Sequence, residues 1–216
     1  MTKYDCVIWD WNGTILDDVS ASLRCVNDML KKRSLRQIGI EEYRSYICTP
    51  ITGFYDNVLD MSRENIDSVL KEYNSGYLKY LETDCGLTKG ITQTLSQIRA
   101  AGICQAIISS CEKNQLISNA EKYGVTEYFD AILGSDDFYA DSKVGRAGSF
   151  IRIKFGKKNV RILVVGDTVS DSMLAKALNA DCLLVKNGHE DRAKLYETGF
   201  PLIPDGSYVG EYIQIQ

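Results

Sequence analysis

Short apolar runs alternate along most of the chain with longer segments of helical period. Runs with the length and apolar content of buried strands are Cys6–Trp9, Cys104–Ile108, Ala131–Leu133, Val160–Val165 and Cys182–Val185. Apolar residues recur every three or four positions in Thr88–Ala101, Asn114–Tyr123, Lys143–Phe155, Ser170–Asn179 and Asp191–Thr198, which predicts helices. This alternation predicts an α/β fold, with a Rossmann-like parallel sheet that has helices on both faces.

The stretch from about Val19 to Gly86 has several helical patterns and no convincing strand. Asp17–Arg33 and Ile40–Ile47 have helical period, and Ser62 is the expected N-cap of a third helix that carries Tyr73 and Tyr77 on its apolar face. We therefore expect a helical cap domain of residues 18–86, inserted after the first strand. Residues 1–17 and 87–216 would then form the core domain.

Composition narrows the function classes. The 216 residues carry a net charge of −4, which argues against a globally basic nucleic-acid binder. A single histidine, His189, excludes multi-histidine metal sites, and the seven cysteines form no CxxC motif that would indicate a zinc knuckle. No targeting segment is visible and no apolar run approaches 18 residues, so we expect a cytoplasmic protein without a membrane partner.

Polar residues follow the predicted strands. Asp10 follows the first strand, Ser109 and Ser110 follow the second, and Asp167 and Asp171 follow the strand at 160–165. Because ligands of open parallel sheets bind at the carboxyl ends of the strands, these groups are expected to converge, together with Lys143. Carboxylates, hydroxyls and a lysine suit phosphoryl transfer, and hard oxygen ligands favour Mg²⁺.

Four motifs in this order resemble those of the haloacid dehalogenase-like (HAD) hydrolase superfamily. Asp10–Asp18 (DWNGTILDD) is similar to its first motif, DxDGT(L/V)xD, and the others correspond to Ile107–Ser110, Lys143 and Gly166–Asp171 (GDTVSD). The helical insertion resembles the C1 cap of the phosphoglycolate phosphatase-like branch. The resemblance implies the HAD fold and a phosphatase of a small phosphorylated metabolite; it leaves the oligomeric state open.

The resemblance also implies roles for individual residues. Asp10 would be the nucleophile that forms an aspartyl-phosphate. The implied Mg²⁺ ligands are Asp10, the main-chain carbonyl of Asn12, Asp167 and Asp171. The implied phosphate-binding groups are Ser109, Ser110, Lys143 and main-chain N–H groups of the 11–14 loop, Thr14 included.

Two positions depart from the family pattern. Asn12 stands where the phosphatases have a second aspartate, the group that protonates the leaving oxygen and then activates water. An amide does neither, so Asn12 indicates slow turnover, a leaving group of low pKa, or an acid supplied by the cap or the substrate. Val144 replaces the proline that usually follows the motif lysine, and Arg146 is a further candidate for the phosphate.

Other functions and ordinary structural roles stay open at this point. Asn12 also fits a catalytically weakened protein that binds a phosphorylated ligand in a regulatory role; a phosphotransferase or mutase is disfavoured by the same residue, and a metal-free dehalogenase by the GDTVSD motif. Several candidates have plain structural alternatives: a helix cap for Asp171, an N-cap or core position for Ser109, and a solvated side chain for Lys143. We favour solvent exposure for Arg44, a surface turn for His189, packing roles for Trp9 and Trp11, and no covalent role for Cys111.

Overall fold

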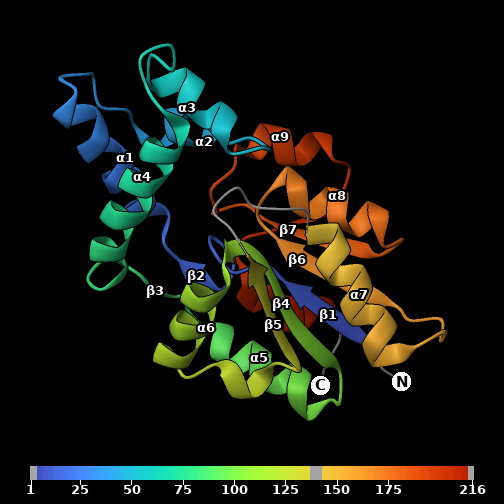
Figure 1. The fold of residues 1–216 in the computed structure, drawn as a ribbon. Helices are drawn as coiled ribbons and strands as arrows, with labels where there is room; N and C mark the ends of the chain where they lie inside the picture. The colour runs from blue at the N-terminus through green and yellow to red at the C-terminus, as the bar shows by residue number, and fades with distance from the viewer. Residues whose placement is uncertain (1–3, 137–142, 214–216) are drawn as a thin grey trace.

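A parallel sheet forms the centre of the protein, in the order β5-β4-β1-β6-β7-β8 (Figure 1). In this computed structural model the described residues are 4–136 and 143–213. The strands of the sheet are β1 (Cys6–Trp9), β4 (Cys104–Glu112), β5 (Ala131–Ser135), β6 (Ile162–Gly166), β7 (Asp181–Val185) and β8 (Leu202–Ile203). Neighbouring strands all run parallel, which confirms the predicted α/β class.

The sheet is buried on both faces because helices cover each of them. Val7 and Trp9 of β1 pack in one apolar cluster with α5 (Ile91–Ala100) and α6 (Lys113–Lys122). Cys6 and Ile8 point to the opposite face, where they pack with three further helices: α7 (Lys143–Phe155), α8 (Val169–Ala177) and α9 (Arg192–Glu197). The alternation of β1 between two cores explains why its sequence is apolar without interruption.

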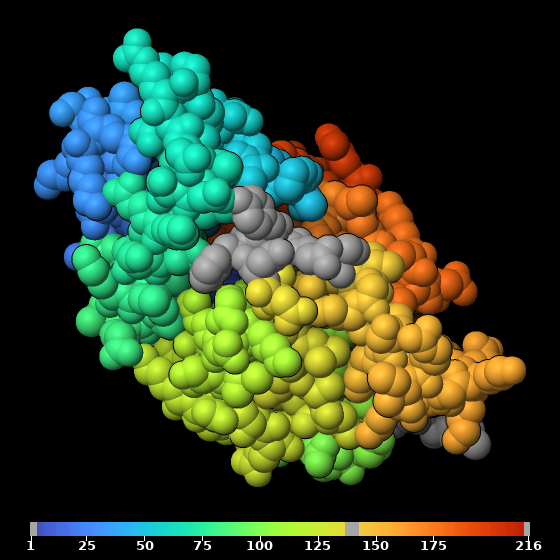
Figure 2. Space-filling view, viewed as in Figure 1, coloured from blue at the N-terminus to red at the C-terminus, as the bar shows by residue number. Residues whose placement is uncertain are grey.

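Between β1 and α5 the chain leaves the sheet and forms a group of four helices. They are α1 (Val19–Lys32), α2 (Ile40–Tyr46), α3 (Thr52–Val58) and α4 (Ile66–Leu81). The chain leaves through β2 (Leu16–Asp17) and returns through β3 (Gly86–Leu87), and these two strands pair antiparallel. The four helices form a lobe beside the sheet, seen in blue to teal in Figure 2, and α1 packs along α4.

Several local expectations are corrected. Ser62 is not the N-cap of α4: Asn65 accepts a hydrogen bond from the Ser68 N–H at 3.1 Å, and the Ser62 hydroxyl donates to Asp60 instead. The strand expected over 104–108 continues to Glu112, so Ser109 and Ser110 lie within β4, where its pairing with β5 shifts register. The helix α3 and the two-residue strands β2, β3 and β8 were not expected. Within the described ranges, no helix is long and apolar enough to cross a membrane.

Candidate active site

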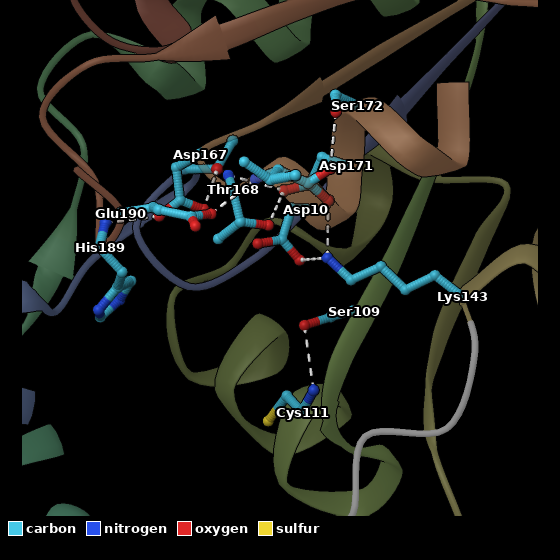
Figure 3. A network of polar contacts seen from close by, with 12 residues as sticks. Asp10, Ser109, Cys111, Lys143, Asp167, Thr168, Asp171, Ser172, His189 and Glu190 are labelled. Carbon is cyan, nitrogen blue, oxygen red and sulfur yellow. Dashed lines mark hydrogen bonds and ion pairs between the residues drawn. The ribbon is translucent and has the colours of Figure 1, made fainter. Parts of the chain in front are cut away.

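Polar side chains gather at the carboxyl edge of the three central strands (Figure 3). Asp10 directly follows β1, and Asp167 directly follows β6, the strand beside it. Ser109 comes from β4 on the other side of β1. Lys143 is the first residue of α7, and Asp171 lies in the first turn of α8. The strand order β4-β1-β6 thus brings together segments that are far apart in the sequence.

Lys143 connects two of the carboxylates. Its Nζ lies 2.7 Å from an oxygen of Asp10 and 2.7 Å from an oxygen of Asp171, and all three side chains are buried. The structural alternative of a solvated side chain for Lys143 is therefore wrong. Burial alone would lower the pKa of Lys143, but the two carboxylates raise it above its ordinary value, so the ammonium group stays charged.

Asp10, Asp167 and Asp171 form a buried carboxylate cluster. One oxygen of each lies within 4.8 Å of the others. Burial raises the pKa of Asp10 although Lys143 opposes the shift, and burial together with the charges of Asp10 and Asp171 raises the pKa of Asp167 to about 8. Three carboxylates face one ammonium group, so the cluster suits a bound divalent metal ion.

Asp171 also caps the start of α8, the structural alternative given for it above. Its second oxygen accepts hydrogen bonds from the N–H of Thr168 at 3.1 Å and from the hydroxyl of Thr168 at 2.7 Å, which caps α8. One oxygen therefore faces Lys143 while the other holds the start of the helix. The capping fixes the direction in which the carboxylate points.

Asp167 is held from two sides. The hydroxyl of Thr14 donates to one of its oxygens at 3.2 Å, and the main-chain N–H of His189 donates to the other at 2.6 Å. The backbone comes so close that a Cβ on Gly13, which has a φ of +69°, would lie 2.3 Å from an Asp167 oxygen. The N–H of Thr14 itself donates to the Trp11 carbonyl. The hydroxyl and the main-chain N–H of Thr14 thus both have partners within the protein and do not point into the cavity.

A cavity of about 310 Å³ opens beside the carboxylates. Of the predicted site residues, the cavity is lined by Asp10, Asn12, Ser109, Ser110, Lys143 and Asp167. Thr14 lies behind Asp167, and Asp171 lies behind Lys143, away from the cavity lining. The Ser109 hydroxyl accepts a hydrogen bond from the Cys111 N–H at 3.2 Å. The cavity therefore brings six of the eight candidate residues to one surface.

Asn12 faces a second buried carboxylate, which was not predicted as part of the site. Its side-chain amide donates to Asp18 at 2.8 Å and to the Tyr77 hydroxyl at 3.0 Å. Asp18 also accepts from the Gly13 N–H at 2.8 Å and from Tyr77 at 2.6 Å. Asp18 stands at the N-cap position of α1 but makes no side-chain cap hydrogen bond there.

His189 completes this network and is not in a surface turn. Its Nε2 lies 3.0 Å from Asp18, and its Nδ1 lies 2.8 Å from the Tyr43 hydroxyl. Burial opposes the charged ring, but Tyr43 and Asp18 raise the pKa of His189 well above its ordinary value. Burial alone would raise the pKa of Asp18, whereas His189 and the hydrogen bonds from Tyr77 and Asn12 lower it. The two residues form a largely buried ion pair across 171 positions of sequence.

Three residues near the cavity do not take part in the proposed chemistry: Arg44 and Arg146 donate to main-chain carbonyls, and Cys111 keeps its proton. The Arg44 guanidinium is not solvated: it donates to the main-chain carbonyls of Asn187 and Gly188, both at 3.0 Å. Arg146 donates to the main-chain carbonyl of Ser109 at 3.0 Å, behind the cavity surface. Burial raises the pKa of the Cys111 thiol to about 12, so no thiolate is present at neutral pH.

The chain is similar to known proteins over most of its length. The family model described as haloacid dehalogenase-like hydrolase matches residues 7–185. A phosphoglycolate phosphatase of Nitrosospira multiformis is 23% identical, over 88% of this chain and 87% of that protein. A phosphoglycolate phosphatase of Pseudomonas fluorescens is 25% identical, over 92% of this chain and 75% of that protein.

Solved structures share the fold. A haloacid dehalogenase-like family hydrolase from Streptococcus pneumoniae superposes with a TM-score of 0.83 at 18% identity, over 99% of this chain and 100% of that chain. CbbY from Rhodobacter sphaeroides, solved in complex with phosphate, superposes with a TM-score of 0.73 at 16% identity, over 96% of both chains. At these identities the likeness establishes the architecture.

Proposed function

Because the chain belongs to the haloacid dehalogenase-like hydrolase family, in the branch of the phosphoglycolate phosphatases, we propose that it is a Mg²⁺-dependent phosphatase of a small phosphorylated metabolite. The observation that carries the proposal is the placement of Asp10 in one buried cluster with Asp167, Asp171 and Lys143. A carboxylate at the end of a central strand, beside a cavity and an ammonium group, is placed to attack phosphorus.

The carboxylate cluster fits a divalent cation. Three buried carboxylates with one lysine leave an excess of negative charge, and carboxylate oxygens are the ligands that Mg²⁺ prefers. Asp10, Asp167, Asp171 and the main-chain carbonyl of Asn12 are the proposed ligands. When bound, Mg²⁺ would offset the repulsion between these carboxylates and the phosphate.

The proposed reaction has two displacements at phosphorus. An oxygen of Asp10 attacks, the bond from phosphorus to the leaving oxygen breaks, and an aspartyl-phosphate forms. Water then attacks phosphorus, the bond to Asp10 breaks, and inorganic phosphate leaves. Lys143 and the Ser109 hydroxyl would hold the phosphoryl oxygens through both steps, because both groups line the cavity beside Asp10.

The residue at position 12 limits the rate at which the leaving oxygen can be protonated. The Asn12 amide is a hydrogen-bond donor to Asp18 and Tyr77, so it supplies no proton to a leaving oxygen. The loss of a general acid lowers a rate by about 10²–10⁴-fold. We therefore propose slow turnover, or a preference for leaving groups of low pKa that need little protonation.

The same observation favours one alternative function. With Asn12 in place, the site retains its carboxylates and its lysine without a proton donor at that position. The alternative is a regulatory protein that binds Mg²⁺ and a phosphorylated ligand without useful turnover. It predicts binding of a phosphorylated ligand in calorimetry, with no release of phosphate.

The helices α1–α4 are proposed to act as the cap, within the residue range 18–86. Tyr77 of α4 contacts Asn12 and Asp18, and Tyr43 of α2 contacts His189. These contacts, and the side chains of α1, α2 and α4 that line the cavity, support a cap that would exclude water and select the leaving group. The cytoplasmic location expected from the sequence stays a prediction.

Phosphate release tests the function directly. We would supply sugar phosphates, acyl phosphates, phosphoglycolate, nucleotides and p-nitrophenyl phosphate, with Mg²⁺ and with EDTA, to the wild type and to Asp10→Asn. The expected result is release by the wild type with Mg²⁺ only, and none by Asp10→Asn. Release that persists in EDTA, or in Asp10→Asn, would refute the proposed chemistry. Tight binding without any release would favour the regulatory alternative.

A further inference from the structure

The cavity has two chemically different walls. The sheet side carries the carboxylate cluster and Lys143. On the helical side, from α1, α2, α4 and the loop after α2, the one charged side chain among the described lining residues is Asp18, which pairs with His189. The other side chains there are uncharged, among them Tyr43, Ile47, Ile51, Tyr73, Asn74 and Tyr77. If the phosphoryl group sits on the sheet side, the helical wall faces the leaving group.

Both cations of the cavity lining are already paired. Lys143 contacts Asp10 and Asp171, and His189 contacts Asp18. Among the described residues that line the cavity, no other side chain is cationic, and Glu112 adds a further negative charge. A leaving group with a carboxylate would find no unpaired cation for it among these residues.

The arginine that follows the cavity residue Tyr43 does not supply a cation for such a carboxylate. Arg44 belongs to α2, directly after the cavity residue Tyr43. Its guanidinium donates to the Asn187 and Gly188 carbonyls and thereby holds the loop that carries His189. Redirecting it toward a ligand would break two hydrogen bonds of 3.0 Å.

An apolar recess continues from the helical wall into the four-helix group. This second cavity, of about 120 Å³, shares Tyr43, Ile47, Ile51, Tyr73 and Asn74 with the first. Its other lining residues are Val26, Phe54, Tyr55 and Leu70. A dry protein cavity of roughly 150 Å³ that is lined by Leu, Ile and Phe binds benzene, so the recess is close to the size of one ring.

The walls of the recess are aromatic and fixed. The rings of Tyr43 and Phe54 in the recess meet edge to face at 5.6 Å, and the ring of Tyr73 stacks at 5.8 Å on Tyr77, which lines the first cavity. Tyr43 and Tyr77 are held in turn by hydrogen bonds to His189 and Asp18. Preordered aromatic rings of this kind favour a flat apolar group over a flexible polar one.

We propose that the leaving group of the substrate is uncharged and carries one aromatic ring, which the recess between α1, α2, α3 and α4 accepts. The proposal rests on the proposed phosphatase function and names the substrate class of the same site. It sets this chain apart from the curated relatives, whose names specify phosphoglycolate, a substrate with a carboxylate in its leaving group.

Two matched pairs of compounds test the proposal. Benzyl phosphate and 4-carboxybenzyl phosphate differ by one charge far from the reacting oxygen, and benzyl phosphate and ethyl phosphate differ by the ring. With Mg²⁺, we expect kcat/KM for benzyl phosphate to exceed that of each partner by about 100-fold or more. Equal values, or a preference for 4-carboxybenzyl phosphate or for phosphoglycolate, would overturn the proposal and leave the phosphatase function intact.

Binding gives a second measurement that needs no turnover. Calorimetry with Mg²⁺ would compare benzylphosphonate with 4-carboxybenzylphosphonate and ethylphosphonate, and the proposal predicts tighter binding of benzylphosphonate than of either. If no phosphate ester is hydrolysed, the phosphatase function fails, while this comparison still decides the ligand class. Equal affinities would overturn the inference.

Substitutions in the recess link the preference to its walls. Asn74→Arg places a cation at the wall that both cavities share, and we expect it to raise kcat/KM for 4-carboxybenzyl phosphate by about tenfold or more, with Asn74→Gln as the neutral control. Leu70→Phe fills the recess and should weaken benzyl phosphate more than ethyl phosphate. No change of preference in a folded Leu70→Phe protein would contradict the placement of the ring.

Discussion

Lys143→Met removes the one ammonium group that lies between two buried carboxylates. The Lys143 ammonium group pairs with Asp10 and Asp171 at 2.7 Å each, and the lysine side chain is only 7% exposed. Methionine keeps the volume of the chain but leaves two carboxylates without a partner. Removal of one member of a buried ion pair destabilises a protein by about 3–5 kcal/mol.

This loss converts into a measurable change in melting temperature. For 216 residues the unfolding entropy is about 0.45 kcal/mol/K, so the loss corresponds to a fall in Tm of roughly 7–11 °C. Part of it should be restored by Mg²⁺, because a divalent cation neutralises the same carboxylates. Thermal unfolding followed by circular dichroism, in EDTA and then in Mg²⁺, gives both quantities.

Lys154→Met is the matched control. Lys154 also lies 2.7 Å from a carboxylate, that of Asp130, but its side chain is 41% exposed. An exposed ion pair contributes about 0–1 kcal/mol, so its loss should lower Tm by no more than about 2 °C. If Lys143→Met and Lys154→Met lower Tm equally in EDTA, the buried charge balance described for the site is wrong.

Three further predictions concern the residues around the cluster. Asn12→Asp should raise kcat for substrates with poor leaving groups by about 10²–10⁴-fold and change p-nitrophenyl phosphate little; an equal change for both would contradict the role given to position 12. In EDTA, the Tm of Asp167→Asn should rise relative to that of the wild type as pH increases from 5 to 8. The folded wild type holds a proton on Asp167 up to a pKa of about 8, while the unfolded chain loses it near pH 4, so the wild type loses stability over this range. A difference in Tm that does not change with pH would count against this reasoning. Tyr77→Phe removes a hydrogen bond from the buried carboxylate of Asp18 and should lower the free energy of unfolding by about 1–3 kcal/mol. Tyr80→Phe is the control and should lower it little, because the Tyr80 hydroxyl donates to an exposed carboxylate; equal losses for the two variants would contradict the importance of the Tyr77 contact.

The sequence predicted the central strands and most of the catalytic edge, because both depend on local information. A run such as Ile162–Gly166 is apolar on both faces, and the carboxylate that follows it must lie at the edge of the sheet. The motif order therefore placed Asp10, Ser109, Lys143 and Asp167 around one cavity before the structure did.

Contacts between distant segments were not predictable from local pattern. Asp18 has the position of a helix-start residue, and His189 lies in a glycine-containing stretch typical of turns, but each finds its partner 171 residues away. The two-residue strands β2, β3 and β8 exist only through their pairing partners. The N-cap at Asn65 instead of Ser62 follows from where packing of Val69 and Leu70 sets the start of α4.

The covalent step on Asp10 is the central claim, and chemical trapping tests it most directly. The protein would be quenched in acid during turnover of p-nitrophenyl phosphate, reduced with borohydride and analysed by peptide mass spectrometry. An acyl phosphate on Asp10 is reduced to homoserine, so the account predicts homoserine at position 10, dependent on substrate and on Mg²⁺. Steady phosphate release with an unmodified Asp10, or with homoserine at another carboxylate, would contradict it.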